Sequence, residues 1–544
     1  MPLSSSLRAN LRFLLVEVTN QLRQLAQYFD NESIITAQQI IQRSGYAYSL
    51  KQRIQNGCTM QLAQGKSTDT LTLRAVTTIA HDLERLTELC RDCVQQLGYL
   101  RRSHRLDLTV FQPLLRQVIK STGRIEAALV DRNTDLALKL GESESKLGAS
   151  YQKLLKKYTQ QLKQKKHTED LVTGLFVAHS IEQMGNALLS ISESIISSNI
   201  GQPMDVQRFY SLRDSLSDWL ETDVLANLDI QPLAETRSGS GISSVNVRDS
   251  NDDQHVAIFK DGERRKLKEE LQGVERWHEI YPGVAPQVFN YKKSGDKAAL
   301  LIEHLQGMTF EQVVLQSSQA EMDKAMATLA ATLTNIWDET HRPQPSPAQF
   351  MAQMQKRLSS VYQIHPDFQQ GKQHIGQHTK PSMNQLIKQA QQLESAHPPP
   401  FSVFIHGDFN IDNVIFEPEQ KRINFIDLHR SEYFDYVQDV SVFMVSNYRL
   451  QVLETEFRQR VRYQALGLYQ VAASYAAQRN DNSFEIRLAL GLARSFATST
   501  RFILDKTMAR RMFYRARYIL EYLLRADLAK PNQFKLPLKE LFSD

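Results

Sequence analysis

The feature that most constrains this chain is the scarcity of glycine and proline over residues 1–225. Gln, Leu, Lys, Glu and Ala are abundant there, and all of these residues favour helices. In Leu73–Leu97 apolar residues recur at three- and four-residue steps, which is the spacing of an amphipathic helix. Long helices are also expected over Leu106–Leu140, Glu144–Lys165 and Thr168–Ile196. Residues 1–225 are therefore predicted to form an all-α antiparallel helical bundle.

The helices of this bundle are expected to break where polar or glycine residues interrupt the pattern. Glycine costs about 1 kcal/mol relative to alanine inside a helix, so it often marks a helix end. The expected breaks are Asn31-Glu32, Gly57, Gly141 and Asn199–Pro203.

Length, net charge and hydrophobicity limit the number of domains, the kinds of partner and the cellular compartment that we expect. A chain of 544 residues is too long for one domain of about 100–200 residues. Its net charge of +5 is small for that length, so no nucleic-acid partner is expected. No run of about 18 apolar residues occurs, which predicts that the chain has no transmembrane segment and is soluble and cytoplasmic.

The three cysteines are Cys58, Cys90 and Cys93, and the last two form a lone C-x-x-C. A structural zinc site needs about four ligands, and the sequence holds no second cysteine pair. The pair also lies in a helical pattern and not after a strand. Two thiols in a hydrophobic core are therefore expected.

The pattern changes near residue 226, where residues that favour β-strands begin to cluster. Strands are expected at Ser244–Val247, His255–Lys260, Gln287–Lys292 and Ala298–Glu303. A turn is expected at Asn251–Asp253, and a helix at Glu263–Tyr281. From Thr309 onward helices dominate, with short strands at Phe401–Ile405, Asn413–Phe416 and Ile423–Ile426. The whole chain is thus predicted to be α+β, with domains at 1–225, 226–307 and 308–544.

One segment, residues 401–443, combines the groups that phosphoryl transfer needs. It holds His406-Gly407-Asp408, then Asn413 five residues after Asp408, then Asp427, with short apolar strands around them. A carboxylate can orient and deprotonate an acceptor hydroxyl, and oxygen ligands can hold Mg²⁺ on the phosphates. The segment is therefore predicted to be a catalytic loop followed by a metal-binding strand end.

The motif H-G-D-F-x-x-x-N-V-x-F, followed by I-D, resembles the aminoglycoside phosphotransferase and choline kinase family. That family shares the two-lobed protein-kinase fold. The resemblance implies that Asp408 is the catalytic base, that Asn413 and Asp427 are Mg²⁺ ligands and that His406 braces the loop. It extends over about residues 235–530.

The resemblance also covers the residues around the core motif. Asp435 and Asp439 resemble downstream acidic positions that support the site in the family. The chain departs from the family over Asp427-Leu428-His429-Arg430, where relatives often carry an aromatic or acidic residue after the aspartate. That departure leaves the identity of the acceptor open.

The same resemblance implies a nucleotide-binding part. Val256–Lys260 resembles the strand that presents the ATP lysine, so Lys260 would contact the α- and β-phosphates. Glu269, Glu270 and Glu275 follow in the next helix, and spacing favours Glu270 as the partner of Lys260. Two further segments complete the expected ATP site: Gly239 and Gly241 as a phosphate loop, which a flexible linker would also explain, and the backbone from Glu303 to Leu305 for adenine.

The helical half carries a second resemblance. Glu182-Gln183-Met184-Gly185-Asn186, followed by Ser190 and Glu193, is similar to a helix signature of the PhoU family. A weaker copy is Glu84–Glu88 with Asp92. In that family acidic residues four apart bind metal clusters, but Asn186 and Ser190 replace the expected residues, so a solvated helix face is the alternative. The resemblance implies regulation or a protein partner, which could be a second copy of the chain.

Together these features predict an ATP- and Mg²⁺-dependent phosphotransferase with an alcohol group as acceptor. Two alternatives stay open: a non-catalytic nucleotide-binding signalling protein, and a scaffold in phosphate-transport regulation. Residues 494–530 hold nine Lys and Arg residues against three acids. Arg511 and Arg515, beside Tyr514 and Tyr518, therefore suggest a small anionic or phosphorylated acceptor. A surface helix, or pairing with the helical half, would explain the same arginines.

Overall fold

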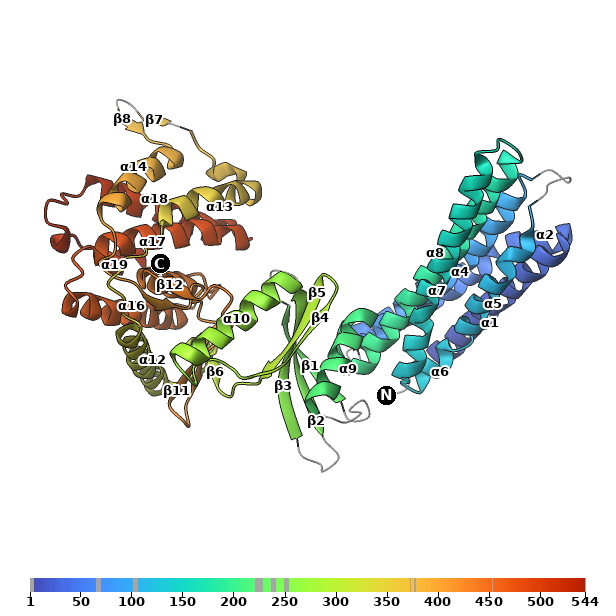
Figure 1. Cartoon of the computed structure of the whole chain (residues 1–544), viewed down its shortest axis with the longest axis horizontal. Coiled ribbons are helices and arrows are strands. Elements are labelled where there is room, and N and C mark those ends of the chain that lie inside the picture. The colour runs from blue at the N-terminus through green and yellow to red at the C-terminus, as the bar shows by residue number, and fades with distance from the viewer. Residues whose placement is uncertain are drawn as a thin grey trace. The chain divides into compact units, whose positions relative to one another are not determined.

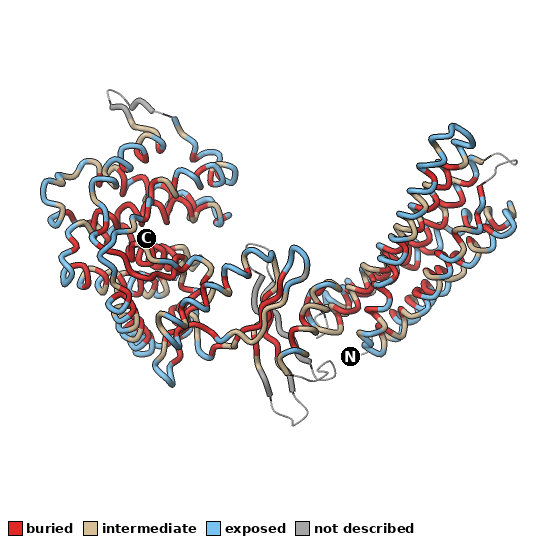
Figure 2. The backbone as a smooth tube through the Cα atoms, in the orientation of Figure 1, coloured by how far each residue is buried: buried red, intermediate tan, exposed pale blue. Residues whose placement is uncertain are grey.

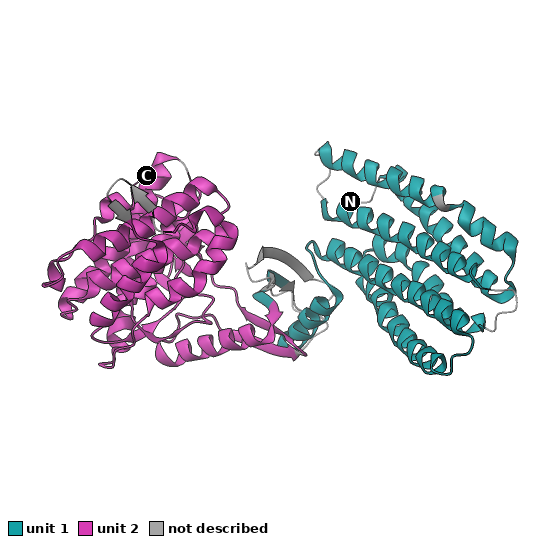
Figure 3. Cartoon of the chain, turned by 90° about the horizontal axis from the view of Figure 1, so that it is seen from above, with its two compact units in different colours: residues 1–260 teal, residues 261–544 magenta. Residues whose placement is uncertain are grey.

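The structure is a computed structural model that describes residues 4–64, 70–100, 106–220, 228–235, 241–248, 254–371, 373–375, 378–452 and 454–543. It divides into two compact units, residues 1–260 and 261–544 (Figure 3). The division falls within strand β3 (Gln254–Glu263). The finer boundaries expected at 225/226 and 307/308 remain predictions.

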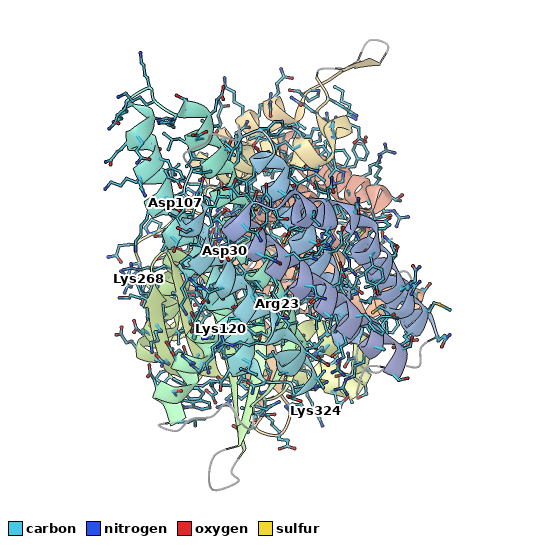
Figure 4. All side chains as sticks on the ribbon, turned by 90° about the vertical axis from the view of Figure 1, so that its right-hand side faces the viewer. Arg23, Asp30, Asp107, Lys120, Lys268 and Lys324 are labelled. Atoms are coloured by element: carbon cyan, nitrogen blue, oxygen red, sulfur yellow. The ribbon has the colours of Figure 1, made fainter. Side chains whose placement is uncertain are left out.

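The first unit consists mainly of helices, and its longest helices lie side by side (Figure 1). Apolar residues along one face of each long helix are buried in the bundle, as the red stretches of Figure 2 show. The outer faces carry charge, for example Arg23 and Asp30 on α1 and Lys120 on α5, which are exposed (Figure 4). The helical elements are α1 (Ser5–Asn31), α2 (Ile34–Gln42), α3 (Ser44–Ala63), α4 (Thr70–Leu97), η1 (Leu108–Phe111), α5 (Gln112–Thr122), α6 (Ile125–Val130), α7 (Thr134–Leu162), α8 (Thr168–Ile200) and α9 (Val206–Leu220).

Helices α7 and α8 show the antiparallel arrangement directly. A Cβ added at Gly174 would lie 2.9 Å from the Tyr158 ring, and one at Gly185 would lie 3.1 Å from Glu144 Cα. Further along, Ser192 Oγ donates to the carbonyl of Ala137 at 2.6 Å. Residues later in α8 thus contact residues earlier in α7, which confirms the predicted antiparallel bundle.

Two of the four expected helix breaks are confirmed and two are wrong. Helix α1 ends at Asn31, and α8 ends at Ile200 before Gly201, whose φ is +84°. Gly57 and Gly141 instead lie inside α3 and α7. A Cβ at Gly57 would come 2.7 Å from Leu7 Cδ2, and one at Gly141 would come 3.0 Å from Ser192 Oγ. These glycines allow close helix contacts, and that packing offsets their low helix propensity.

The single helix expected over Leu106–Leu140 is also wrong. The region divides into η1, α5, α6 and the start of α7. Asn133 begins α7 because its side chain accepts a hydrogen bond from the backbone N–H of Leu136 at 2.9 Å. The helices expected over Leu73–Leu97 and Thr168–Ile196 are confirmed within α4 and α8, and the one expected over Glu144–Lys165 lies in α7 up to Leu162.

The cysteines of the first unit are core thiols, as predicted. Cys58, Cys90 and Cys93 are buried and free. Burial raises the pKa of Cys90 to about 12, so its thiol stays protonated at neutral pH. In the part of the chain that the structure describes, no helix is long and apolar enough to span a membrane.

Among the described residues, the first unit also contains β1, β2 and most of β3. Strand β1 (Leu228–Glu235) pairs antiparallel with β2 (Gly241–Arg248), with Ile230 opposite Val245. The expected strands at Ser244–Val247 and His255–Lys260 are confirmed within β2 and β3. Strand β1 was not anticipated. The expected turn at Asn251–Asp253 lies outside the described residues.

The second unit begins with a helix on a β-hairpin and continues mainly with helices. Helix α10 (Arg264–Ile280) packs on β4 (Val288–Ser294) and β5 (Lys297–Glu303), which are antiparallel (Figure 1). Short strands at 403–405, 414–417 and 422–425 confirm the three that were expected there. The remaining elements are β6 (Met308–Thr309), α11 (Phe310–Gln316), α12 (Gln319–Glu339), α13 (Phe350–Ile364), η3 (Pro366–Phe368), β7 (Gln373–Ile375), β8 (His378–Lys380), α14 (Met383–Ala396), β9 (Val403–Ile405), β10 (Val414–Glu417), β11 (Arg422–Phe425), β12 (Glu432–Phe434), α15 (Val437–Tyr448), α16 (Thr455–Gln478), α17 (Phe484–Ser499), η4 (Thr500–Phe502), α18 (Lys506–Arg525), η5 (Pro531–Gln533) and α19 (Leu538–Leu541).

Helices α15 and α17 form the centre of this unit. Every residue of α15 is buried, and so is every residue of α17 except Ser499. A Cβ at Gly491 would lie 2.9 Å from Ser441 Cβ, so the two helices touch closely. The buried Arg487 of α17 forms ion pairs with Asp435 and Asp481. This buried network holds α17 against the start of α15, where the candidate site lies.

Candidate active site

The hairpin of β10 and β11 brings the two predicted metal ligands to one end of a sheet. Val414 pairs with Phe425, and the N–H of Ile426 donates to the carbonyl of Asn413 at 3.0 Å. Asn413 and Asp427 therefore lie next to each other where the hairpin opens. Asp427 has a φ of +62°, a left-handed conformation that is uncommon for residues other than glycine.

A short loop joins Asp408 to Asn413 through hydrogen bonds. Asn413 Nδ2 donates to the carbonyl of Asp408 at 2.9 Å, and its backbone N–H donates to the carbonyl of Asn410 at 2.9 Å. Asn410 Nδ2 donates to Asp408 Oδ1 at 3.0 Å. Asn413 is buried, whereas the side chain of Asp408 is 23% exposed. The loop thus presents one accessible carboxylate beside a buried amide.

His406 connects this loop to the strand that leads to Asp427. Its Nε2 donates to the carbonyl of Ile426 at 2.9 Å, and its Nδ1 accepts from the N–H of Asp408 at 3.3 Å. Burial lowers the pKa of His406, which favours a neutral ring with its proton on Nε2. Such a ring fixes the distance between the Asp408 loop and β11. The geometry fits the predicted bracing role.

The backbone before Asp408 is held by Asp439 at the start of α15. The carboxylate of Asp439 accepts from the N–H of His406 at 2.8 Å and from that of Gly407 at 2.9 Å. Burial raises the pKa of Asp439 to about 7. Gly407 has a φ of +83°, and a Cβ there would lie 2.2 Å from the carbonyl oxygen of Arg430. Only glycine fits this turn without moving the backbone.

The residues that depart from the family pattern link the two carboxylates of the site. Arg430 Nη1 lies 3.0 Å from Asp408 Oδ2, and Arg430 Nε donates to His429 Nε2 at 3.0 Å. His429 Nδ1 in turn donates to Asp427 Oδ1 at 2.8 Å. A chain of contacts therefore runs from the proposed base to the proposed metal ligand. The sequence marked His429 and Arg430 only as part of the departing segment Asp427–Arg430 and predicted no contacts for them.

Helix α10 packs directly on the segment after Asp427. A Cβ added at Gly273 would lie 2.1 Å from the carbonyl oxygen of Leu428. Trp277 Nε1 donates to Ser431 Oγ at 2.8 Å, and Ser431 Oγ donates to the carbonyl of His406 at 3.2 Å. Glu270 is buried one turn before Gly273 on the same helix. The structure thus brings the helix of Glu270 to the end of the hairpin where Asn413 and Asp427 lie.

The predicted adenine segment leads into the same hairpin. Glu303 ends β5, and Leu305 is buried. Gly307 has a φ of +117°, and a Cβ there would lie 2.3 Å from the carbonyl oxygen of Phe416. Strand β6 then pairs with β10, with Met308 opposite Phe416. The segment from Glu303 to Gly307 is therefore held against β10, the strand that begins just after Asn413.

The structure gives fewer contacts for the other predicted nucleotide-binding residues. Lys260 is buried near the end of β3, and its pairing with Glu270 stays a prediction. Gly241 begins β2. Gly239 lies outside the described residues.

The acidic row of the helical half does not form a metal cluster in the described structure. Glu84 is buried and pairs with Lys51 at 3.2 Å, whereas Glu88 and Asp92 are exposed. The described residues contain no group of three or more His, Cys, Asp or Glu side chains placed to hold a metal ion.

Comparison with known proteins finds one family model that is similar to part of the chain. Residues 236–477 match the family model of the phosphotransferase enzyme family. No curated protein matches the sequence. All of the residues that build the Asp408 loop and the β10–β11 hairpin lie within the matched range.

Three solved structures are similar to parts of the chain. The phosphate transport system regulatory protein PhoU from Streptococcus pneumoniae covers 37% of this chain and 96% of its own, at 14% identity and a TM-score of 0.35. An aminoglycoside-3'-phosphotransferase of type VIII covers 49% and 92%, at 16% identity and a TM-score of 0.32. Plasmodium vivax ethanolamine kinase covers 58% and 90%, at 11% identity and a TM-score of 0.36. These likenesses are too weak to indicate an activity.

The family match therefore rests on the sequence of residues 236–477, and the geometry of the site is described independently of it.

Proposed function

We propose that the chain transfers the γ-phosphoryl group of ATP to the hydroxyl of an acceptor, with Mg²⁺ as the cofactor. One observation carries the proposal: Asp408, Asn413 and Asp427 meet at the open end of one hairpin, and a neutral His406 fixes their spacing. Phosphoryl transfer relies on positioning and charge more than on covalent help from the protein. A rigid group of one accessible carboxylate and two oxygen-bearing side chains suits that task.

Each residue of the site has a distinct proposed role. Asp408 accepts the proton of the acceptor hydroxyl, and its partly exposed side chain allows the acceptor to reach it. Asn413 donates its amide N–H to the Asp408 carbonyl, which turns its Oδ1 away from that carbonyl and toward a cation. Asp427 supplies a carboxylate, so the donor set is the hard oxygen set that Mg²⁺ prefers. When bound, Mg²⁺ would neutralise charge on the phosphate oxygens.

We propose that the predicted nucleotide-binding residues each contribute to ATP binding. Lys260 would contact the phosphates with Glu270 as its partner, and the backbone from Glu303 to Leu305 would bind adenine. The support is that Lys260 and Glu270 are both buried, which is rare for charged residues that have no specific role. Gly239 and Gly241 would let backbone N–H groups approach the phosphates.

The helical unit is proposed to bind a protein partner that regulates the enzyme. The supporting observation is a set of large apolar side chains exposed on its first helices. They include Phe13, Val16, Ile34 and Ile35. Exposed apolar groups of this kind are common where proteins associate. The partner could be a second copy of the chain.

A γ-phosphate transfer assay tests the proposal. Radiolabelled ATP and Mg²⁺ would be incubated with the full chain and pooled hydroxyl-bearing metabolites, with Asp408→Asn as the matched control. Label that moves to a metabolite with wild type and not with the variant supports the enzyme. If wild type binds Mg²⁺·ATP but transfers nothing to any pool, the non-catalytic nucleotide-binding alternative is favoured.

A further inference from the structure

Three arginines from separate parts of the second unit lie around the proposed base. We call these residues the arginine cluster: Arg357 on α13, Arg430 after β11 and Arg494 on α17. Arg430 touches Asp408 directly, with Nη1 3.0 Å from Oδ2. All three guanidinium groups interact electrostatically with Asp408 or with one another. None of them belongs to the metal-binding or nucleotide-binding set proposed above.

Arg357 is tied to the catalytic loop through two glutamines. Its Nη1 donates to Gln353 Oε1 at 3.5 Å, and Gln353 Nε2 donates to Gln438 Oε1 at 3.0 Å. Gln438 Nε2 donates to the carbonyl of Gly407 at 3.1 Å. The chain of hydrogen bonds therefore runs from Arg357 to the residue immediately before Asp408.

Arg494 is buried with part of its hydrogen-bonding capacity unused in the described part of the chain. The residue is 5% exposed, and its Nε and Nη2 atoms have no hydrogen-bond partner in the described part of the chain. Its guanidinium lies 5.5 Å from the centre of the Phe350 ring on α13. Burial, together with Arg357, lowers the pKa of Arg494 to about 9. An unpaired buried cation is costly, so a group that arrives with a ligand is the natural counter-charge.

The nearby carboxylates already have other partners. Asp439 accepts from the two backbone N–H groups before Asp408. Glu394 caps α13, because its carboxylate accepts from the N–H groups of Phe350 and Met351 at 2.5 and 3.2 Å. Asp435 pairs with Arg487. These acids therefore do not supply the hydrogen bonds that Arg494 lacks.

The arginines of α18 are differently placed. Arg515 donates to the carbonyls of Leu541 and Ser543 at 2.8 and 2.5 Å, and its guanidinium lies 4.7 Å from the centre of the Tyr448 ring. Tyr448 ends α15, nine residues after Asp439, which is about 14 Å along a helix. Arg515 thus holds the C-terminal segment at the far end of α15 from the catalytic loop.

We infer that the arginine cluster binds a carboxylate or phosphate group on the same acceptor whose hydroxyl faces Asp408. This inference rests on the proposed phosphotransferase function. Arginine forms paired hydrogen bonds to the oxygens of both groups, which suits a planar carboxylate as well as a phosphate. In the described structure Arg430 pairs with Asp408, so an anionic acceptor that takes over Arg430 would also release the base.

Binding of inorganic phosphate in the presence of saturating Mg²⁺·AMP-PNP tests the inference on the full chain. The nucleotide analogue occupies the donor site, so added phosphate reports the acceptor site. We expect calorimetry to show phosphate binding to wild type, and at least a tenfold weaker affinity in Arg357→Gln and Arg494→Gln. Arg462→Gln, an exposed arginine of α16, is the matched control and should bind like wild type.

Two other results would overturn the inference. One is phosphate binding that is absent in wild type or equally strong in both cluster variants. The other is a tenfold loss of AMP-PNP affinity in the cluster variants, which would mean that the arginines hold the donor phosphates. If wild type fails to bind AMP-PNP, the proposed function is contradicted. Failure of the proposed function can therefore be distinguished from failure of the acceptor inference.

A folding readout separates a binding role from a structural one. Because Arg494 Nε and Nη2 make no hydrogen bond in the described part of the chain, Arg494→Gln should unfold at the same temperature as wild type or at a higher one. Glycerate and glycerol are then compared as acceptors in the transfer assay. Both carry hydroxyl groups, but only glycerate carries a carboxylate. Stimulation of ATP turnover by glycerol equal to that by glycerate would contradict selection for an anion.

Discussion

The carboxylate of Asp439 accepts hydrogen bonds from the N–H of Gly407 at 2.9 Å and from the N–H of His406 at 2.8 Å. A single buried side chain on α15 therefore fixes the backbone that presents Asp408. Because the same burial raises the pKa of Asp439 to about 7, this contact also makes stability depend on pH.

The first prediction is that the unfolding temperature falls as pH rises from about 4 to 7. The folded-state pKa of Asp439 lies above its value of 3.8 in an unfolded chain, so the folded protein binds more protons in that window. Asp439 contributes fully to stability when the pH is below its pKa in the unfolded chain. That contribution is lost as the pH rises through its pKa in the folded protein. Asp439→Asn should remove this component, as measured by thermal unfolding of both proteins across the window.

Asp412→Asn is the control, because Asp412 is an exposed aspartate of the same loop. It should keep the pH dependence of wild type. A variant at Asp439 whose pH profile parallels wild type would show that another group causes the effect.

The second prediction concerns the contact between α10 and the segment after Asp427. Gly273→Ala places a methyl group 2.1 Å from the Leu428 carbonyl oxygen, so α10 must move. Overpacking of this kind costs about 1–3 kcal/mol. We expect a lower unfolding temperature and weaker binding of Mg²⁺·AMP-PNP, since α10 carries Glu270.

Gly467→Ala provides the comparison for Gly273→Ala. Its added methyl would meet only the terminal Cε of Met326 at 2.9 Å, and a flexible side chain can move away. That variant should match or exceed wild type in stability because alanine favours helices. Equal behaviour of the two variants would contradict the tight contact at Leu428.

Local patterns predicted the β10–β11 hairpin and placed its candidate residues in one short segment. Asn413 and Asp427 each adjoin a short apolar strand, and a tight hairpin brings strand ends together without help from the rest of the chain. The resemblance then identified Asp408 and His406 within the same short segment. The hydrogen bonds that link His406 to Ile426 and Asp408, and Asp408 to Asn413, span at most 20 residues, so local sequence held most of this information.

The parts that were missed depend on contacts between distant segments. Gly57 and Gly141 were expected to end helices, yet each lies where another helix passes closely. Arg357 and Arg494 are separated by more than 130 residues, and only the packing of α13 on α17 brings their helices together. Nothing in the local sequence of either arginine distinguishes it from a solvated helix residue.

The third prediction concerns where the nucleotide-binding part begins. A fragment starting at Leu228 retains β1 to β3 and Lys260, whereas a fragment starting at Asp261 lacks both. We expect the longer fragment to fold and bind Mg²⁺·AMP-PNP, and the shorter one to bind at least tenfold more weakly. Calorimetry on both fragments measures the difference. An insoluble longer fragment would indicate that the helical unit is needed for folding, contrary to the predicted domain boundary near residue 226.

The final prediction separates the two carboxylates of the site by their effects. Asp408→Ala removes the group that accepts the hydroxyl proton, and general-base catalysis is worth about 10²–10⁴-fold in rate. Phosphoryl transfer should fall by that factor, while Mg²⁺·AMP-PNP binding stays close to wild type. Asp427→Ala removes a metal ligand, so its affinity for Mg²⁺·AMP-PNP should fall at least tenfold, or about 1.4 kcal/mol.

Thermal-shift titration with Mg²⁺·AMP-PNP tells these two variants apart, and repeating it without Mg²⁺ supplies the control. In the absence of metal, wild type and Asp427→Ala should respond alike, because the difference between them depends on the cation. Equal stabilisation of Asp427→Ala and wild type in the presence of Mg²⁺ would remove Asp427 from the metal site. Undiminished transfer by Asp408→Ala would assign the base to another residue, and Arg430, its partner at 3.0 Å, would then require a different role.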